Sequence, residues 1–286
     1  MFRTFVSTAE LAAHLDDPSW AVVDVRYSLT DTAAGRAHYL EAHIPGAVYA
    51  SLSHDLASTP SGTNGRHPLP SVEAMAATFG RLGIGPGTQV VCYDADNMFA
   101  ARLWWMLRYL GHDAVAVLDG GFPAWIRENR PTRGGDEHRA AASFSPALRA
   151  GMRVGLDTVA AASTDGSLRL IDARAPERFE GKNETLDKAA GHIPGAGNRF
   201  FKLNFADDGT VRPARELREQ LSAATGGRPM HEVVMYCGSG VTACQNLLAA
   251  EHAGLPGARL YVGSWSEWSA DPARPVETGP AKPPSR

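Results

Sequence analysis

Short apolar runs, many of them β-branched, recur along the chain and are separated by stretches with helical spacing. The runs lie at 21–25, 89–93 and 114–118 in the first half and at 168–173, 232–236 and 259–262 in the second. They do not alternate with polar residues, so they fit strands buried on both faces of a parallel sheet. Residues 100–110 and 242–252 carry apolar positions on one helical face. The pattern predicts an α/β fold, with helices covering a mainly parallel sheet.

The chain repeats itself once, in order. The motif His43-Ile44-Pro45-Gly46-Ala47 returns as His192-Ile193-Pro194-Gly195-Ala196, and three further segments recur at a similar offset: 22–26 with 170–174, 90–93 with 233–236, and 120–125 with 263–268. Repetition over such a long period indicates a duplicated domain, not a solenoid. We predict two tandem domains, 1–130 and 153–286, joined by a linker at 131–152 that is rich in charges and glycine. The proline-rich tail from 272 to 286 should be extended or frayed.

Composition narrows the class of protein. The 286 residues carry 28 Lys+Arg against 31 Asp+Glu, a net charge of −3. The chain therefore has no excess of positive charge that would attract nucleic acid. No apolar run is long enough to span a membrane, and the N-terminus has no secretory pattern. Three cysteines are too few for a disulfide scaffold and fit a reducing compartment. We expect a cytoplasmic protein with neither a nucleic acid nor a membrane as partner.

The strongest chemical signal follows the apolar run at 232–236. Cys237-Gly238-Ser239-Gly240-Val241-Thr242 connects that run to a predicted helix. Glycines permit a tight loop whose backbone N–H groups turn inward, and the helix adds its positive N-terminal end. Such a position suits an anion and favours a thiolate, so Cys237 is a candidate nucleophile. The alternative is an inert buried cysteine, which is our interpretation of Cys92 and Cys244.

The matching loop in the first half differs in the decisive residue. Asp94 stands where Cys237 stands, and Asp96 adds a second acid. A loop whose anion-binding cradle of backbone N–H groups already holds carboxylates should not bind a further anion. We therefore expect the first domain to be catalytically silent and the active site to belong to the second.

These features resemble the two-domain rhodanese-like sulfurtransferases, over nearly the whole chain. The loop after Cys237 looks like the 3-mercaptopyruvate sulfurtransferase version, since thiosulfate-using members carry Arg and Lys where this chain has Gly238 and Ser239. The resemblance implies that a Cys237 persulfide carries sulfur from a small-molecule donor, 3-mercaptopyruvate, to a thiol, cyanide or a thioredoxin-like protein, with no cofactor and no metal. It also implies that the loop binds the donor, through Gly238, Gly240, Val241 and Thr242.

The resemblance assigns roles outside the loop as well. Arg178 matches a family arginine that binds the donor carboxylate. A second family arginine is missing, and Lys188 or Lys182 is its candidate replacement. In related mercaptopyruvate enzymes the serine at the position of Ser239 works with a histidine and an aspartate, and His67 matches that histidine. An ungapped count from the His43 motif places the family aspartate at Ser53, which is not an acid. Asp55, two residues later, is therefore the candidate for that aspartate.

Three other interpretations remain open. The same scaffold could serve as a thiosulfate:cyanide sulfurtransferase. A cysteine-dependent phosphatase or arsenate reductase uses a similar cradle but needs an arginine six positions after the cysteine, where this chain has Ala243. A non-catalytic rhodanese-like module would bind partners and form no persulfide.

Overall fold

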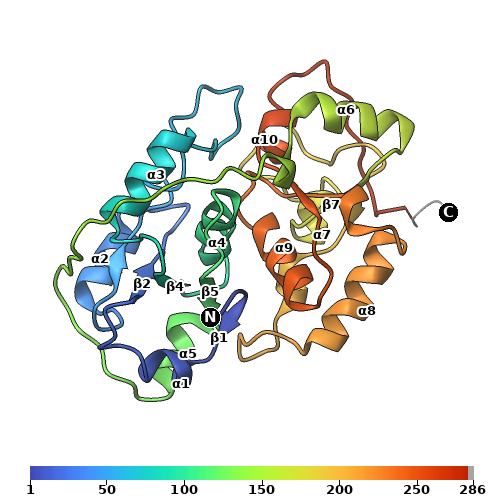
Figure 1. Cartoon of the computed structure of the whole chain (residues 1–286). Helices are drawn as coiled ribbons and strands as arrows, with labels where there is room; N and C mark the ends of the chain where they lie inside the picture. The colour runs from blue at the N-terminus through green and yellow to red at the C-terminus, as the bar shows by residue number, and fades with distance from the viewer. Residues whose placement is uncertain (283–286) are drawn as a thin grey trace. The chain divides into compact units, whose positions relative to one another are not determined.

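The structure, a computed structural model, describes residues 1–282 and divides into two compact units (Figure 1). The first unit comprises Met1–Ser58, Leu69–Arg149 and Phe205–Val211. The second comprises Thr59–Pro68, Ala150–Asn204 and the chain from Arg212 onward. The last four residues of the predicted tail, 283–286, lie outside the described residues. Thus one short segment from the first half of the chain, Thr59–Pro68, belongs to the second unit.

The first unit is built on a five-stranded parallel sheet in the order β1-β5-β4-β2-β3. Its strands are β1 (Phe5–Val6), β2 (Trp20–Asp24), β3 (Val48–Tyr49), β4 (Gln89–Tyr93) and β5 (Val115–Leu118). Its helices are α1 (Thr8–Ala12), α2 (Ala34–Glu41), α3 (Val72–Arg81), α4 (Ala100–Tyr109) and α5 (Gly121–Arg127). Every residue of β2 and β4 is buried, as runs without polar alternation predict.

The second unit repeats this plan, with the strand order β6-β10-β9-β7-β8, again parallel throughout. Its strands are β6 (Arg153–Val154), β7 (Arg169–Asp172), β8 (Gly197–Asn198), β9 (Val233–Tyr236) and β10 (Arg259–Tyr261). Its α-helices are α6 (Leu156–Asp165), α7 (Pro176–Phe179), α8 (Ala214–Thr225), α9 (Ala243–His252) and α10 (Ser264–Trp268). Three 3₁₀ turns complete it, η1 (Ala150–Met152), η2 (Phe201–Asn204) and η3 (Met230–Glu232). The predicted α/β duplication with mainly parallel sheets is confirmed.

The repeated residues that end the strands fix loops in both units. In the second unit, the guanidinium of Arg174 donates to Asp172 and to the Gly191 carbonyl beside the repeated histidine turn. The Ile193 N–H donates to the Tyr236 hydroxyl in that turn. The first unit has the same arrangement around the Asp24–Arg26 pair. These buried pairs hold the turns against the strand ends and so shape the edge where β9 stops.

Each unit has its own apolar core on its sheet. The first core gathers Val22, Val91, Ala116 and Leu118 from the strands with Trp125 from α5. The second gathers equivalent side chains, among them Val234, Tyr236, Tyr261, Trp265 and Trp268. Burial of this many apolar side chains, each contributing about 1.5–3 kcal/mol, is the main stabilisation of either sheet.

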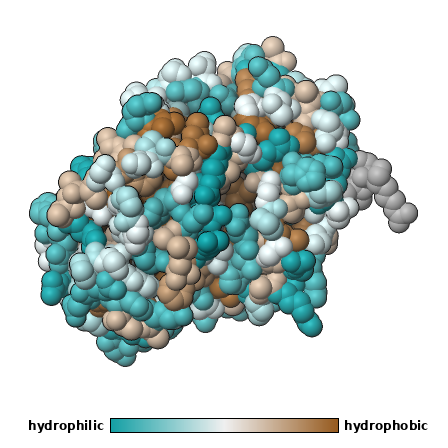
Figure 2. Space-filling view, viewed as in Figure 1, coloured by the Kyte–Doolittle hydropathy of each residue, from teal (hydrophilic) through white to brown (hydrophobic). Residues whose placement is uncertain are grey.

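The segment between the repeats has little regular structure. It runs along the first unit, where Arg133 exchanges backbone hydrogen bonds with His43 and the Ala142 N–H donates to the Gly80 carbonyl. Within residues 1–282, no helix is long and apolar enough to cross a membrane. On the face drawn in Figure 2, hydrophilic residues predominate and hydrophobic residues form small groups.

Candidate functional site

Cys237 lies at the carboxyl end of β9, the middle strand of the second sheet. Its side chain is only 2% exposed. The Cys237 N–H donates to the Ser264 hydroxyl at 3.1 Å, and its carbonyl accepts the Trp265 N–H at 2.9 Å. The next carbonyl, of Gly238, accepts the Ser266 N–H at 2.9 Å. Strand β9 and the start of α10 therefore fix the backbone on both sides of the thiol.

The loop after Cys237 needs glycine at one position. Gly240 has φ +72°, and a Cβ there would overlap the Val262 carbonyl. The N–H groups of Cys244 and Gln245 then donate to the Val241 and Thr242 carbonyls, which starts α9. Loop and helix N-terminus thus meet at the end of β9, as the glycine pattern predicts.

The matching loop of the first unit shows what such a backbone can hold. Six residues separate β4 from α4, as six separate β9 from α9. The Asp94 carboxylate accepts N–H groups from Asn97, Phe99 and Ala100 at 2.6–2.8 Å. Asn97, with φ 58°, takes the left-handed conformation that Gly240 takes in the second unit. The cradle in the first unit is thus occupied by its own carboxylate.

Burial dominates the electrostatics of Asp94. Its side chain is almost fully buried, and this burial raises the pKa of its carboxyl, although the backbone hydrogen bonds act in the opposite direction.

Ser239 and His67 are brought together by the segment Thr59–Pro68. His67 Nδ1 and Ser239 Oγ are hydrogen-bonded at 2.8 Å. Ser239 is buried, and His67 is partly exposed. A hydroxyl and an imidazole in hydrogen-bond contact can exchange a proton.

Arg178, on α7, is held beside the loop by two acidic residues. Its guanidinium donates to Glu184 at 2.8–3.2 Å and to Asp187 at 3.0 Å. A Cβ placed on Gly238 would lie 3.6 Å from Arg178 Nη1. The carboxylates are almost fully buried, whereas the Arg178 side chain is 22% exposed. A cation therefore lies next to the residue that follows Cys237.

The pKa values of the two carboxyl groups shift in opposite directions. Burial alone would raise the pKa of Glu184, but hydrogen bonds from Arg178 and from the N–H groups of Leu186 and Asp187 outweigh it and lower the pKa. For Asp187 burial prevails and raises the pKa, against the attraction of Arg66 and Arg178.

Arg66 is a neighbour of the site that the sequence motifs did not indicate. It forms an ion pair with Asp187, and its Nη2 would lie 2.9 Å from a Cβ on Gly238. It precedes His67 in the same segment, so proximity to that histidine was the one available signal.

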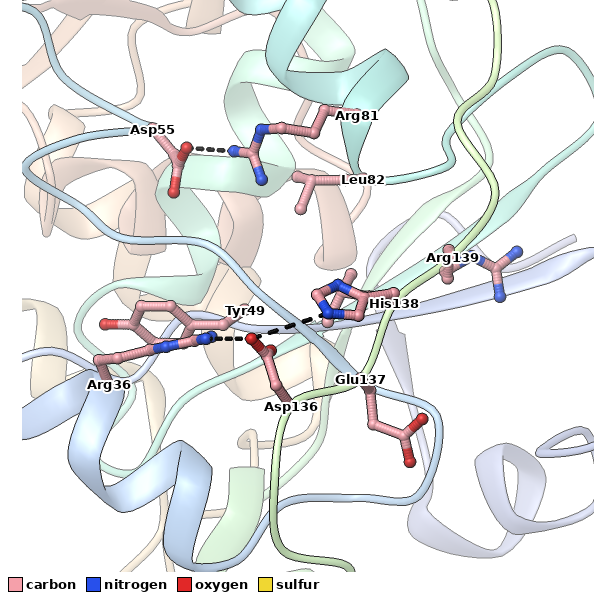
Figure 3. Close-up of a pocket in the computed structure, with 10 residues that line it drawn as sticks. Arg36, Tyr49, Asp55, Arg81, Leu82, Asp136, Glu137, His138 and Arg139 are labelled. Atoms are coloured by element: carbon pink, nitrogen blue, oxygen red, sulfur yellow. Dashed lines mark hydrogen bonds and ion pairs between the residues drawn. The ribbon is translucent and has the colours of Figure 1, made fainter.

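The remaining predicted site residues have other contacts. Asp55 lies in the first unit, where it accepts the Ser51 N–H and forms an ion pair with Arg81 in a cavity of about 470 Å³ (Figure 3). Lys188 is exposed and donates to the Gly62 carbonyl at 3.3 Å. Lys182 is exposed and pairs with Glu180. The roles suggested for Asp55 and Lys188 stay predictions.

The other two cysteines are packed inside the units. Cys92 lies within β4, and burial raises the pKa of its thiol far above its usual range. Cys244 lies on α9, fully buried, with its thiol directed at the Gly240 carbonyl at 3.4 Å. Cys237 differs from both because its side chain belongs to a loop at a strand end.

Comparison with known proteins gives a consistent result. The rhodanese-like domain family matches residues 7–128 and 156–271. The chain is 44% identical to a Pseudomonas aeruginosa protein named "Probable 3-mercaptopyruvate sulfurtransferase", over 96% of this chain and 98% of that protein. It is 33% identical to the thiosulfate sulfurtransferase of Bos taurus, over 94% and 92%. The crystal structure of SseA from Escherichia coli, described under 3-mercaptopyruvate sulfotransferases, superposes with a TM-score of 0.79 and 32% identity, over 93% of this chain and 100% of that one.

Proposed function

Because this chain belongs to the rhodanese-like family and is a sulfurtransferase, we propose that it moves sulfane sulfur from 3-mercaptopyruvate to a thiol, cyanide or a thioredoxin-like protein through a persulfide on Cys237. The observation that carries the proposal is the grouping around the residues after Cys237. Arg178 lies beside Gly238, and Ser239 is hydrogen-bonded to His67. Three consecutive loop positions, 237–239, thus carry the cysteine, the contact with a cation for a carboxylate, and one partner of a proton-transfer pair.

The first half-reaction breaks one carbon–sulfur bond. The Cys237 thiolate attacks the sulfur of the donor, and the new S–S bond leaves a persulfide on the enzyme. The electron pair of the broken C–S bond goes to the carbon fragment, which leaves as the enolate of pyruvate. Arg178 binds the donor carboxylate through charge-assisted hydrogen bonds.

The enolate then needs one proton at carbon to become pyruvate. We assign its delivery to the Ser239–His67 pair, since the hydroxyl lies two residues from the nucleophile and the imidazole can replace its proton from solvent. A candidate acid to orient His67 is Asp55, from the sequence motif.

In the second half-reaction an acceptor thiolate attacks the outer sulfur of the persulfide. The S–S bond breaks, the acceptor becomes a persulfide, and Cys237 returns to its thiolate. Until then the loop N–H groups and the N-terminus of α9 stabilise the persulfide anion. The loop residues Gly238, Gly240, Val241 and Thr242 provide this binding site.

We propose that the loop after β4 in the first unit forms no sulfur-transfer site of its own. Its loop carries Asp94 in place of Cys237, and that carboxylate already accepts the N–H groups that an anion would need.

Thiosulfate is the second candidate donor. The specific observation in its favour is that two guanidinium groups, of Arg66 and Arg178, lie near Gly238, although the loop itself is neutral. Two cations suit a dianion better than one does.

One experiment separates these functions. The reduced protein is incubated with 3-mercaptopyruvate or with thiosulfate; pyruvate and thiocyanate are measured, and Cys237 is examined for an added 32 Da. We expect the adduct with both donors and faster turnover with mercaptopyruvate. Faster turnover with thiosulfate would make thiosulfate the preferred donor. The absence of the adduct with both donors would instead favour a non-catalytic binding module. The predicted cytoplasmic location is tested separately by cell fractionation.

A further inference from the structure

We propose that the segment 274–279, near the end of the chain, is a positioning element for the sulfur-transfer reaction. It fixes both ends of the loop 181–191, whose acidic side chains hold Arg178 in place. The proposal rests on the proposed function of Cys237 and Arg178. The segment acts through the loop and not by contact with the sulfur donor.

Each sequence repeat ends with a similar short segment. Residues 130–135 are Arg-Pro-Thr-Arg-Gly-Gly, and residues 274–279 are Arg-Pro-Val-Glu-Thr-Gly. We call 130–135 the first clasp and 274–279 the second clasp. The first clasp overlaps the predicted linker, and the second lies in the predicted tail. The duplication therefore extends past the four motifs that revealed it, and the second clasp is the end of a domain.

The first clasp is attached to its own unit at two anchors. Arg133 exchanges two backbone hydrogen bonds with His43, the histidine of the repeated turn motif, at 2.8 and 2.9 Å. The Gly135 N–H donates to the Leu40 carbonyl at 2.8 Å. His43 and Leu40 are thus the two anchors, and they hold the clasp against the turn.

The second clasp repeats these contacts in the second unit. Glu277 exchanges two backbone hydrogen bonds with His192 at 2.8 and 3.0 Å, and the Gly279 N–H donates to the Glu180 carbonyl at 3.0 Å. In both units an indole N–H also donates to the carbonyl of the clasp proline, from Trp125 to Pro131 and from Trp268 to Pro275. The anchors of the second clasp are therefore His192 and Glu180.

The two clasps differ in what lies between their anchors. In the first unit only residues 41–42 separate Leu40 from His43. In the second unit the whole loop 181–191 lies between the anchors. The second clasp therefore closes the base of a loop that has no counterpart between the anchors of the first.

Both ends of this loop are glycines that the second clasp approaches closely. Gly191 has φ +115°, and a Cβ there would lie 2.5 Å from the Glu277 carbonyl oxygen and 2.7 Å from Val276 Cγ1. Gly181 has φ +81°, and a Cβ there would lie 3.1 Å from Thr278 Cγ2. The side-chain-free backbone at both positions lets the clasp pack directly on the base of the loop.

The loop carries the carboxylates that hold Arg178. Glu184 accepts from this guanidinium at 2.8–3.2 Å and Asp187 at 3.0 Å, and both carboxylates are almost fully buried. At the base of the loop, the Gly191 carbonyl accepts from Arg174 at 2.7 Å. The same Arg174 guanidinium donates to Glu184 at 3.2 Å. Because buried hydrogen bonds link the base to the carboxylates, a shift of the base should also displace Arg178.

Proline substitution tests the clasp because it removes a single backbone donor. Glu277→Pro deletes the N–H that donates to the His192 carbonyl. Arg133→Pro deletes the equivalent N–H, which donates to the His43 carbonyl, and is the matched control in the first unit. Glu277→Ala and Arg133→Ala remove the side chains alone, so each proline variant is compared with the alanine variant at the same position.

Two measurements report on the donor site. One is KM and kcat for 3-mercaptopyruvate. The other is the ratio of the rates at which iodoacetate and iodoacetamide alkylate Cys237, which depends on the reagent's carboxylate and needs no turnover. We expect Glu277→Pro to raise KM and to lower the ratio, each about fivefold, with little change in kcat, since Arg178 is displaced and not removed. In a protein that already carries Arg178→Gln, it should add little to either effect.

The control should separate positioning from stability. Arg133→Pro should lower the midpoint of urea unfolding about as much as Glu277→Pro and leave KM and the alkylation ratio unchanged. If Glu277→Pro fails to fold, Gly279→Ala and Gly135→Ala form a milder matched pair. Their φ values are +92° and +93°, and among the described residues an added Cβ meets nothing within 4 Å at either position. Each strains one clasp in the same way, and only Gly279→Ala should change the ratio.

The outcomes separate this proposal from the proposed function. Unchanged KM and alkylation ratio in Glu277→Pro, or equal changes in Arg133→Pro, would make the second clasp a structural element only. Either result would overturn the proposal even if mercaptopyruvate is turned over. A lowered ratio in Glu277→Pro but not in Arg133→Pro, in a protein that does not use mercaptopyruvate, would support the clasp and reject only the donor.

Discussion

Replacing Arg178 with glutamine tests the donor site and the ion-pair network together. In the proposed function the guanidinium binds the donor carboxylate, and one charged hydrogen bond contributes about 1.5–3 kcal/mol. Since 1.4 kcal/mol corresponds to a factor of ten, kcat/KM for 3-mercaptopyruvate should fall about tenfold to a hundredfold. Because Arg178 is only 22% exposed, solvent screening should not bring the effect below this range.

The same substitution should cost stability, but only moderately. It removes the Arg178 hydrogen bonds to Glu184 and Asp187, both almost fully buried. Glu184 keeps Arg174 at 3.2 Å and Asp187 keeps Arg66, so neither carboxylate loses every partner. The cost should therefore be about 1–2 kcal/mol, below the 3–5 kcal/mol of a buried charge left alone.

The stability cost has a pH dependence with a definite sign. The pKa of Glu184 is lowered from its ordinary 4.5, so the ionised form stabilises the fold above that pH and the benefit is lost as pH falls. Without Arg178, each carboxyl group loses an attraction to a guanidinium, so the pKa of each should rise. The difference in free energy of unfolding between the two proteins should be largest near pH 7 and shrink below pH 4.5.

Urea unfolding at several pH values and steady-state kinetics measure these effects separately. Arg178→Lys is the matched variant, since it keeps the charge and loses the planar fork. A lowered stability with unchanged kcat/KM would make Arg178 a structural residue only. An equal stability loss at pH 4 and pH 7 would refute the electrostatic explanation.

Three other predictions follow from the site. Cys237→Ser should abolish turnover and the 32 Da adduct, whereas Cys244→Ser should retain both; an adduct on Cys237→Ser would reject the nucleophile. His67→Gln should lower kcat about a hundredfold while KM changes little, since the Ser239 hydroxyl loses its proton partner; an unchanged pH profile of kcat would contradict this. Burial raises the pKa of Asp94 above 3.8, so ionising this carboxyl costs stability as pH rises. Between pH 4 and pH 7, Asp94→Asn should therefore gain stability relative to the original protein, with sulfur transfer unchanged. If urea titrations gave both proteins the same pH dependence of the free energy of unfolding, this prediction would be wrong.

The fold was predictable because its long elements carry strong periodic signals. The apolar run 89–93 has the same bounds as strand β4. The run 232–236 begins one residue before strand β9 and ends with it. The strands β1, β3, β6 and β8 have two residues each and were not predicted. A pair of residues has no periodicity, and its pairing is decided by the neighbouring strand.

The grouping of residues beside Cys237 was predictable where its members follow each other in sequence or match a motif. Cys237 and Ser239 share one loop, and His67 was identified by its motif. Arg66 was not identified, because an arginine in a polar loop is indistinguishable from a solvated charge until the loop is packed. Its position depends on the backbone of Thr59–Pro68 meeting Ser266, two hundred residues along the chain. No local pattern encodes such a contact.

The duplication shows how little separates the loop after β4 from the loop after β9. Both loops have six residues between strand and helix, and both place one residue in the left-handed conformation, Asn97 in one and Gly240 in the other. The first loop therefore turns its backbone N–H groups toward one carboxylate without the glycines of the second loop. The difference lies in the occupant. Asp94 brings its own anion and satisfies the N–H groups permanently, whereas the shorter Cys237 side chain leaves the charge to be supplied by a thiolate, a persulfide or a donor.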